Sequence, residues 1–117
     1  MPERDETVYV RHMLDAIERI EQYISGVDED GFFSDSMLQD AVVRQLEILG
    51  EAAGRVSKET CGRAPEIPWA QVTGTRHRLI HDYFEVDTEL VWGVATVDLV
   101  SLKPKLEALL ERLRGEA

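Results

Sequence analysis

The fold class follows from the stretch between Asp5 and Ser25, which reads DETVYVRHMLDAIERIEQYIS. Its apolar residues recur at spacings of three and four, with charged residues between them: Val10, Leu14, Ile17, Ile20 and Ile24. That period places them on one face of an α-helix. The pattern predicts a helix from about residue 5 to residue 25, with Gly26 as its stop signal.

A second helix is predicted to begin near residues 34–36, where serine and aspartate can cap it, and to continue to about Lys58. Its apolar stripe consists of Leu38, Val42, Leu46 and Leu49. The acidic segment 27–35 between the two helices is expected to be a loop. We expect Phe32 and Phe33 to fold back from this loop onto the core.

Two glycines, Gly50 and Gly54, fall inside the second predicted helix. A glycine in a helix interior lowers stability by about 1 kcal/mol relative to alanine. Such glycines indicate that another backbone packs closely against the helix.

The second half of the chain predicts two more helices. Residues 59–68 contain Gly62, Pro65 and Pro68 and are expected to form a connection. Pro68 suits the first turn of a third helix, from Trp69 to about Tyr83.

A fourth helix is predicted to start at Thr88 as its N-cap and to carry Leu90, Val91, Val94, Val97 and Leu99. Pro104 is expected to kink or break it near Ser101, before a helical segment resumes over residues 106–113. No segment resembles a strand with turn residues beside it. The predicted architecture is therefore all-α, an up-and-down bundle of four to five helices in a single domain over residues 1–117.

Composition excludes several classes of protein. The chain has 117 residues, of which 44% are hydrophobic and 31% charged, a normal globular balance. No stretch approaches the roughly 20 apolar residues that span a membrane, and the acidic N-terminus does not resemble a signal peptide. The single Cys61 cannot form an intramolecular disulfide and is given no role. These features predict a cytoplasmic location without membrane contact.

Charge is unevenly distributed along the chain. The formal net charge is -10, which opposes binding of nucleic acid over the whole surface. Residues 54–81 are the exception, because five basic residues stand there against Glu59 and Glu66: Arg55, Lys58, Arg63, Arg76 and Arg78. This cationic segment could admit a phosphate, with Arg78, Arg55 and Lys58 as possible RNA contacts. The alternative is an ordinary solvated helix end.

Reactive side chains concentrate between Arg76 and Phe84, which reads RHRLIHDYF. On a helix, residues four apart share a face, so His77 and His81 would point the same way, and Arg78 could pair with Asp82. Arg76 and His81 are five residues apart, about 140° around the axis. One straight helix therefore does not unite them. Either the helix distorts near His81, or a second copy of the chain completes the site.

These residue types suit cleavage of RNA. Histidine can accept and donate a proton near neutral pH, and arginine binds phosphate oxygens with a fork of donors. The 2′-hydroxyl of RNA can attack the neighbouring phosphorus without a metal or cofactor. Zinc held by His77 and His81 is an alternative, but it requires a third ligand. Spacing alone favours a third interpretation, with both histidines on a helix surface and Tyr83 in the core.

The flanking sequence resembles the HepT-like branch of the HEPN superfamily. Members carry an arginine, a polar residue, a short spacer and then His-x-Tyr, as Arg76, His77, His81 and Tyr83 do here. Further segments that match the family are LGEAA at 49–53, IPW at 67–69, YF at 83–84, VD at 86–87 and VW at 91–92. The resemblance covers Val8 to Leu113. One departure is Thr75, where members often have methionine.

The resemblance implies a dimer with the two motifs lining one cleft. It also implies a metal-independent endoribonuclease toxin, in which Arg76 binds the scissile phosphate and His81 acts as acid and base. His77 would be a polar supporter, and Glu51 would lie near the cleft.

The resemblance further implies a partner, a minimal nucleotidyltransferase antitoxin that can adenylylate Tyr83. The alternatives are a catalytically silent dimer that serves this nucleotidyltransferase as a scaffold or substrate-binding partner, and a plain helical adaptor.

Overall fold

The computed structural model describes residues 5–82 and 85–115, and the side chains of residues 76, 80–82 and 85 lie outside the described part. Its long helices are α1 (Thr7–Ile24), α3 (Ser36–Arg55) and α8 (Leu99–Gly115). Shorter elements connect them: α2 (Glu29–Phe33), α4 (Lys58–Gly62), α5 (Trp69–Thr73), α6 (Thr75–Leu79), β1 (Ile80–Asp82), β2 (Glu85–Val86), α7 (Thr88–Gly93) and the π-helical turn η1 (Val94–Asp98).

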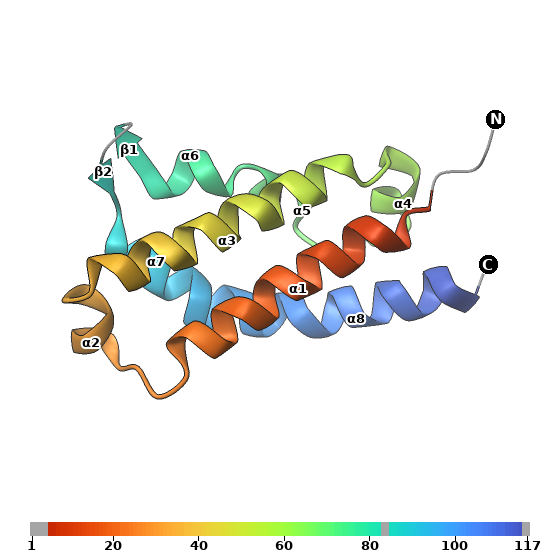
Figure 1. Ribbon diagram of the computed structural model, residues 1–117. Helices are drawn as coiled ribbons and strands as arrows, with labels where there is room; N and C mark the ends of the chain where they lie inside the picture. The colour runs from red at the N-terminus through yellow and green to blue at the C-terminus, as the bar shows by residue number, and fades with distance from the viewer. Residues whose placement is uncertain (1–4, 83–84, 116–117) are drawn as a thin grey trace.

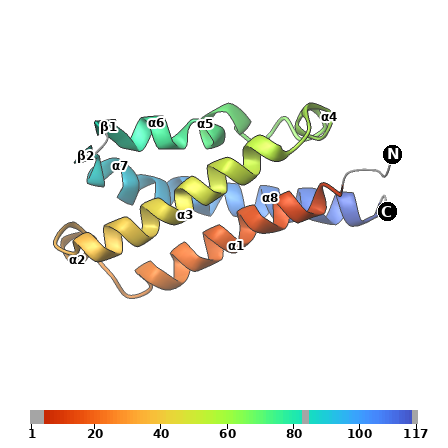
Figure 2. The same ribbon diagram turned by 45° about the horizontal axis from the view of Figure 1, so that its top comes forward.

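Successive runs alternate in direction, so the chain forms an all-α, up-and-down bundle (Figure 1). The four runs are α1, α3, α5 with α6, and α7 through η1 to α8. Helix α1 packs most extensively against α3 and next against α8, while α5 and α6 pack on α3. Both views place β1, β2 and α2 at one end of the bundle, here called the hairpin end (Figure 2). Helix α4, the start of α1 and the end of α8 lie at the other end.

The first predicted helix is confirmed as α1. Its apolar face is buried, with Val10 and Ile20 at 0% exposure and Ile17 at 1%. Gly26 follows the helix with a φ of +76°, a left-handed conformation that glycine adopts without steric cost. No helix of the described residues has both the length and the apolar character needed to cross a membrane.

The segment predicted as a loop contains the short helix α2. Asp28 caps it, because its side chain accepts a hydrogen bond from the Gly31 N–H at 2.8 Å. Phe32 is completely buried and its ring centroid lies 5.1 Å from that of Trp92. The expectation for Phe33 is wrong, since this side chain is 39% exposed.

Helix α3 begins where it was predicted, after Asp35, whose side chain accepts a hydrogen bond from the Leu38 N–H at 3.0 Å. The close backbone approach is confirmed at Gly50. A Cβ atom there would lie 3.0 Å from the Val72 carbonyl oxygen of α5. Gly54 has more room, because the nearest atom to its added Cβ would be a methyl group of Thr73 at 4.0 Å.

The single helix predicted from Trp69 to Tyr83 is wrong. The chain breaks at Gly74 between α5 and α6, and helix α6 ends at Leu79. In a continuing helix the Leu79 carbonyl would accept from the fourth residue ahead. Here it accepts the Asp87 N–H at 2.8 Å. The next residues leave the helix to pair antiparallel as β1 and β2, with Ile80 opposite Val86. Tertiary hydrogen bonds thus override the helical pattern.

The fourth predicted helix also differs in detail. Asp87, rather than Thr88, caps α7 by accepting the Leu90 N–H at 3.1 Å. The break expected near Ser101 is wrong, because α8 runs without interruption past Ser101 and Pro104. Pro104 is exposed while Leu102 and Leu106 on either side are buried. The hydrogen bond that proline removes therefore falls on the solvent side, and core packing maintains the helix. The helix departs from regular α-helical geometry earlier, in the π-helical turn η1.

Candidate functional site

The motif spans the junction between a helix and a strand. Arg76 lies in α6 and His81 in β1, and the buried Leu79 anchors the chain between them. Of the two alternatives drawn from helical geometry, distortion near His81 is confirmed, because the helix ends two residues before it. Helical spacing therefore no longer puts His77 and His81 on one face, or Arg78 beside Asp82. The helical argument for zinc is lost with it.

The side chains of Arg76 and His81, and the whole of Tyr83, lie outside the described residues. Two motif neighbours are described completely. His77 and Arg78 are both exposed on α6. Thr75, at the start of the same helix, is buried and its hydroxyl donates to the Gln71 carbonyl at 3.0 Å. This bond joins α6 to α5 across the break at Gly74.

Arg78 borders a groove of about 200 Å³ where α5 and α6 face η1 and α8. Thr75 and Asp98 line it, and the core residues Leu49 and Leu102 contribute apolar surface. The groove thus lies beside the helix that carries Arg76.

Glu51 lines a different depression of about 290 Å³ along α3, together with Arg44, Leu46, Glu47, Gly50 and Thr73. A side-chain oxygen of Glu51 lies 3.6 Å from a guanidinium nitrogen of Arg55, one turn later in the helix. Both side chains are mostly exposed. A long contact between solvated groups contributes little to stability. The position of Glu51 is therefore set by the α3 backbone and not by the Arg55 contact, and its carboxylate faces solvent.

The cationic segment divides into two groups. Arg55 ends α3 and Lys58 begins α4, at the end of the bundle away from the hairpin (Figure 1). Arg76 and Arg78 belong to α6, near the hairpin end. The structure therefore does not unite the candidate RNA contacts Arg55, Lys58 and Arg78 in one patch.

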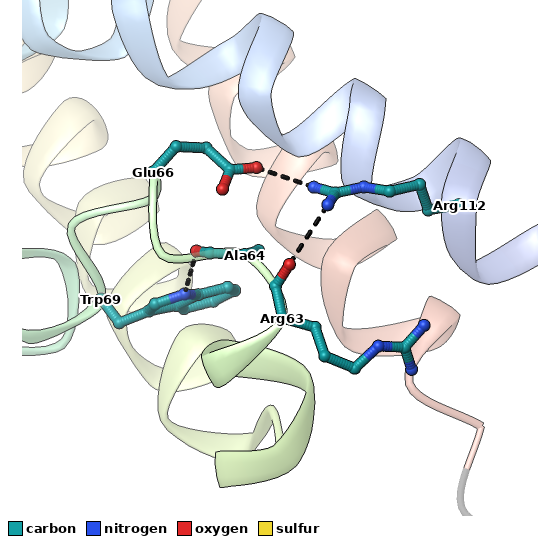
Figure 3. A network of polar contacts seen from close by, with 5 residues as sticks. All are labelled: Arg63, Ala64, Glu66, Trp69 and Arg112. Atoms are coloured by element: carbon teal, nitrogen blue, oxygen red, sulfur yellow. Dashed lines mark hydrogen bonds and ion pairs between the residues drawn. The ribbon is translucent and has the colours of Figure 1, made fainter.

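A polar network holds the connection that leads into α5 (Figure 3). The Arg112 guanidinium donates to Glu66 Oε1 at 2.7 Å and to the Arg63 carbonyl at 3.2 Å. The Trp69 indole N–H donates to the Ala64 carbonyl at 3.0 Å. Backbone hydrogen bonding at Glu66, followed by the Arg112 contact, lowers the pKa of the Glu66 carboxyl. The network fixes the start of α5 and thereby the run that leads to the motif.

Arg44 is a candidate that sequence patterns missed. It is exposed on α3 and shares a helix face with Glu47 and Glu51, which follow three and seven residues later. Arg44 lies in the acidic first half of the chain, outside the cationic segment over residues 54–81. The spacing of 44, 47 and 51 was the available signal.

Sequence comparisons identify the family. The family model described as "Ribonuclease HepT-like" matches residues 13–112. The chain belongs to the HepT-like ribonuclease family, whose HEPN-like all-α bundle is the fold described above.

Several curated proteins are similar over nearly the whole chain. It is 39% identical to "Probable ribonuclease HepT" of Thermococcus cleftensis over 101 residues, covering 86% of this chain and 92% of that protein. It is 30% identical over 116 residues to a "Putative RNase" of Methanocaldococcus jannaschii, covering 99% and 96%.

A longer protein of Methanocaldococcus jannaschii, named "Gamma-glutamylcyclotransferase and putative RNase", is 39% identical over 110 residues. The match covers 94% of this chain but 50% of that protein. No solved structure shows significant similarity to the chain.

Proposed function

We propose that the protein is a metal-independent endoribonuclease, and that residues 1–117 form one HepT-like domain. Membership of the HepT-like ribonuclease family carries this proposal, together with the Arg76, His77, His81 and Tyr83 motif in its expected order. The helix-to-strand junction supports it, because the two proposed catalytic residues belong to different elements. Groups on different elements are not restricted to the face of one helix.

In the proposed reaction, His81 takes the proton from a 2′-hydroxyl as the 2′-oxygen attacks the adjacent phosphorus. The bond from phosphorus to the 5′-oxygen breaks, and His81, now acting as the acid, gives that proton to the leaving 5′-oxygen. The products are a 2′,3′-cyclic phosphate and a 5′-hydroxyl. Arg76 binds the phosphate and stabilises the negative charge that develops on its oxygens. His77 and Glu51 support these groups.

The site is tested by incubating the purified protein with RNA in the presence of EDTA. We expect cleavage by the unmodified protein and a loss of at least about 100-fold in His81→Ala and Arg76→Ala, since acid–base catalysis contributes typically 10²–10⁴-fold. His12→Ala and Arg19→Ala are matched controls, because both residues are exposed on α1. Cleavage that persists in His81→Ala would contradict the catalytic assignment.

We further propose that two copies of the chain form a homodimer whose motifs line a shared cleft. Light scattering tests this directly, and a monomer at all concentrations used in the cleavage assay would exclude a shared site.

The proposed biological setting is a cytoplasmic toxin–antitoxin pair of HEPN and nucleotidyltransferase proteins. The antitoxin would adenylylate Tyr83 and so add bulk and negative charge to the cleft. Mass spectrometry after co-expression with a minimal nucleotidyltransferase should detect an added AMP on Tyr83. Absence of that mass would count against this mode of neutralisation.

The net charge of -10 favours one alternative, a catalytically silent dimer that serves the nucleotidyltransferase as a scaffold or substrate-binding partner. Bulk repulsion opposes RNA association. An inactive but dimeric protein that binds the nucleotidyltransferase would support this alternative over the enzyme.

A further inference from the structure

The depression on α3, here called the α3 hollow, has the features of a small binding site. Its volume of about 290 Å³ is near the lower end of the range typical of small-molecule pockets. The lining residues are Arg44, Leu46, Glu47, Gly50, Glu51 and Thr73. Gly50 lets the α5 backbone come close at this point, because an added Cβ would lie 3.0 Å from the Val72 carbonyl oxygen. The hollow therefore has room for one nucleotide rather than a stretch of RNA.

The α3 hollow lies next to the motif helix. Helix α3 runs antiparallel to the α5–α6 run (Figures 1 and 2). Gly50 of α3 lies beside Val72 of α5. Arg44 comes six residues before Gly50, about 9 Å along the helix axis toward the hairpin end. Helix α6, which carries Arg76, packs against α3. A nucleotide in the hollow would thus neighbour a phosphate bound at the motif.

Arg44 is available to a ligand. Within the part of the chain that the structure describes, its guanidinium forms no ion pair, and its side chain is exposed. Arg44 and Glu51 are two helical turns apart on the same face, about 10.5 Å along the axis. The Arg44 guanidinium, with its fork of donors, and the Glu51 carboxylate therefore lie at opposite ends of the hollow. Glu47 lies between them.

This combination of groups selects guanine among the four bases. Guanine offers the acceptors O6 and N7, which an arginine fork matches. Its Watson–Crick edge also offers two neighbouring donors, N1–H and N2–H, which one carboxylate can accept together. Cytosine, adenine and uracil lack that pair of neighbouring donors. Bases of single-stranded RNA can be splayed out and recognised on both edges.

We propose, resting on the ribonuclease function proposed above, that the α3 hollow binds the guanine base of the nucleotide next to the scissile phosphate. Glu51 accepts from the Watson–Crick edge, and Arg44 donates to O6 and N7. The two residues determine which RNA is cut and take no part in the proton transfers.

Binding is tested without cleavage, by NMR titration of His81→Ala with 5′-GMP, 5′-AMP, 5′-CMP and 5′-UMP. We expect 5′-GMP to shift the amide signals of Gly50 and Thr73 and to bind at least about fivefold more tightly than the others, as for one good base contact. Glu51→Gln and Arg44→Ala, each added to His81→Ala, should abolish that preference. Glu107→Gln and Arg19→Ala are matched controls on exposed faces of α8 and α1.

Equal binding of all four nucleotides, or signal changes elsewhere than at the α3 hollow, would overturn the inference. A second arm uses the active protein and RNA oligonucleotides that differ in one base beside the cleaved bond. We expect Arg44→Ala to lose the guanine preference while it still cleaves RNA. RNA cleavage without any base preference removes the guanine site and leaves the ribonuclease standing. A preference for 5′-GMP in a protein that cuts no RNA would support the guanine site and contradict the ribonuclease function.

Discussion

Gly50 of α3 lies against the α5 backbone, whereas Gly54, one turn later, has a methyl group of Thr73 as its nearest neighbour. In Gly50→Ala the new methyl group would lie 3.0 Å from the Val72 carbonyl oxygen, in a helix that cannot move freely because Val72 is buried. Overpacking of this kind costs typically 1–3 kcal/mol, which outweighs the gain of about 1 kcal/mol in helix propensity. We expect Gly50→Ala to lower the free energy of unfolding by about 1 kcal/mol.

Gly54→Ala is the matched control, because it gains the same propensity with its nearest contact at 4.0 Å. We expect it to raise the free energy of unfolding by up to about 1 kcal/mol. Urea denaturation measures both variants. Equal effects of the two substitutions would contradict the close approach at Gly50.

The Glu66 carboxylate helps to fix the connection that leads into α5, through its contact with Arg112. Its pKa is lowered by backbone hydrogen bonding and then by Arg112. A lowered pKa in the folded state means that this carboxylate stabilises the fold above its unfolded pKa, near 4.5. The contribution is lost as the pH falls through the lower folded value. We expect Arg112→Met to raise the pKa of Glu66 toward its ordinary value and to weaken this loss of stability with acid.

An NMR titration of the Glu66 carboxyl measures that change. Arg114→Met is the control, because Arg114 is also exposed on α8. Since backbone hydrogen bonding comes first among the causes, only part of the shift should disappear in Arg112→Met. An unchanged pKa of Glu66 in that variant would show that the contact in Figure 3 is too weak in solution to matter.

At the scale of elements, α8 contains a proline that the helix does not need. Proline in a helix interior is about 3 kcal/mol less favourable than alanine, and Pro104 is exposed. We expect Pro104→Ala to raise the free energy of unfolding by about 1–3 kcal/mol, measured by urea denaturation. Ser101→Ala, an exposed change in the same helix, should stay within about 0.5 kcal/mol. Destabilisation by Pro104→Ala would mean that α8 depends on a bend at this residue.

The helices differ in how well sequence patterns predict them. Helices α1 and α3 could be predicted because their apolar faces repeat over five turns and their ends carry Gly26 and Asp35. The π-helical turn η1 could not, because its apolar residues fit an ordinary helix equally well. Pro104 alone indicates a break in the helix, because the burial of Leu102 and Leu106 on either side of it arises only in the assembled core.

The motif shows a second limit of sequence patterns. The residues from Trp69 to Tyr83 carry a helical pattern, yet the helix ends at Leu79. The deciding interaction joins Leu79 to Asp87, eight residues later, and local periodicity carries no sign of it. Residue types indicated Arg76 and His81 as site residues, but the positions of their backbones depend on this hydrogen bond between Leu79 and Asp87. Arg44 was missed for a similar reason, because its value comes from α5 lying beside Gly50.

At the scale of the whole molecule, charge limits how RNA can bind. The net charge is -10, and the basic residues of the cationic segment are divided between the two ends of α5. Each phosphate contact to single-stranded nucleic acid adds a slope of about -0.7 to the plot of log affinity against log salt. With one or two such contacts, we expect a slope no steeper than about -2.

Binding of a fluorescent RNA to His81→Ala over a range of salt concentrations measures that slope. Added salt also screens the repulsion between RNA and the acidic body, which makes the slope shallower still. A slope near -5 would instead require an extended basic surface, contrary to the charge distribution. The comparison therefore separates local recognition of one phosphate from general adhesion to nucleic acid.

The up-and-down order has a practical consequence for handling the protein. The start of α1 and the end of α8 lie together with α4, at the opposite end of the bundle from β1 and β2 (Figure 1). An affinity tag or a fluorescent reporter can therefore be fused near either terminus and still project away from the motif. A surface-immobilised protein attached in this way would present its hairpin end to the solution.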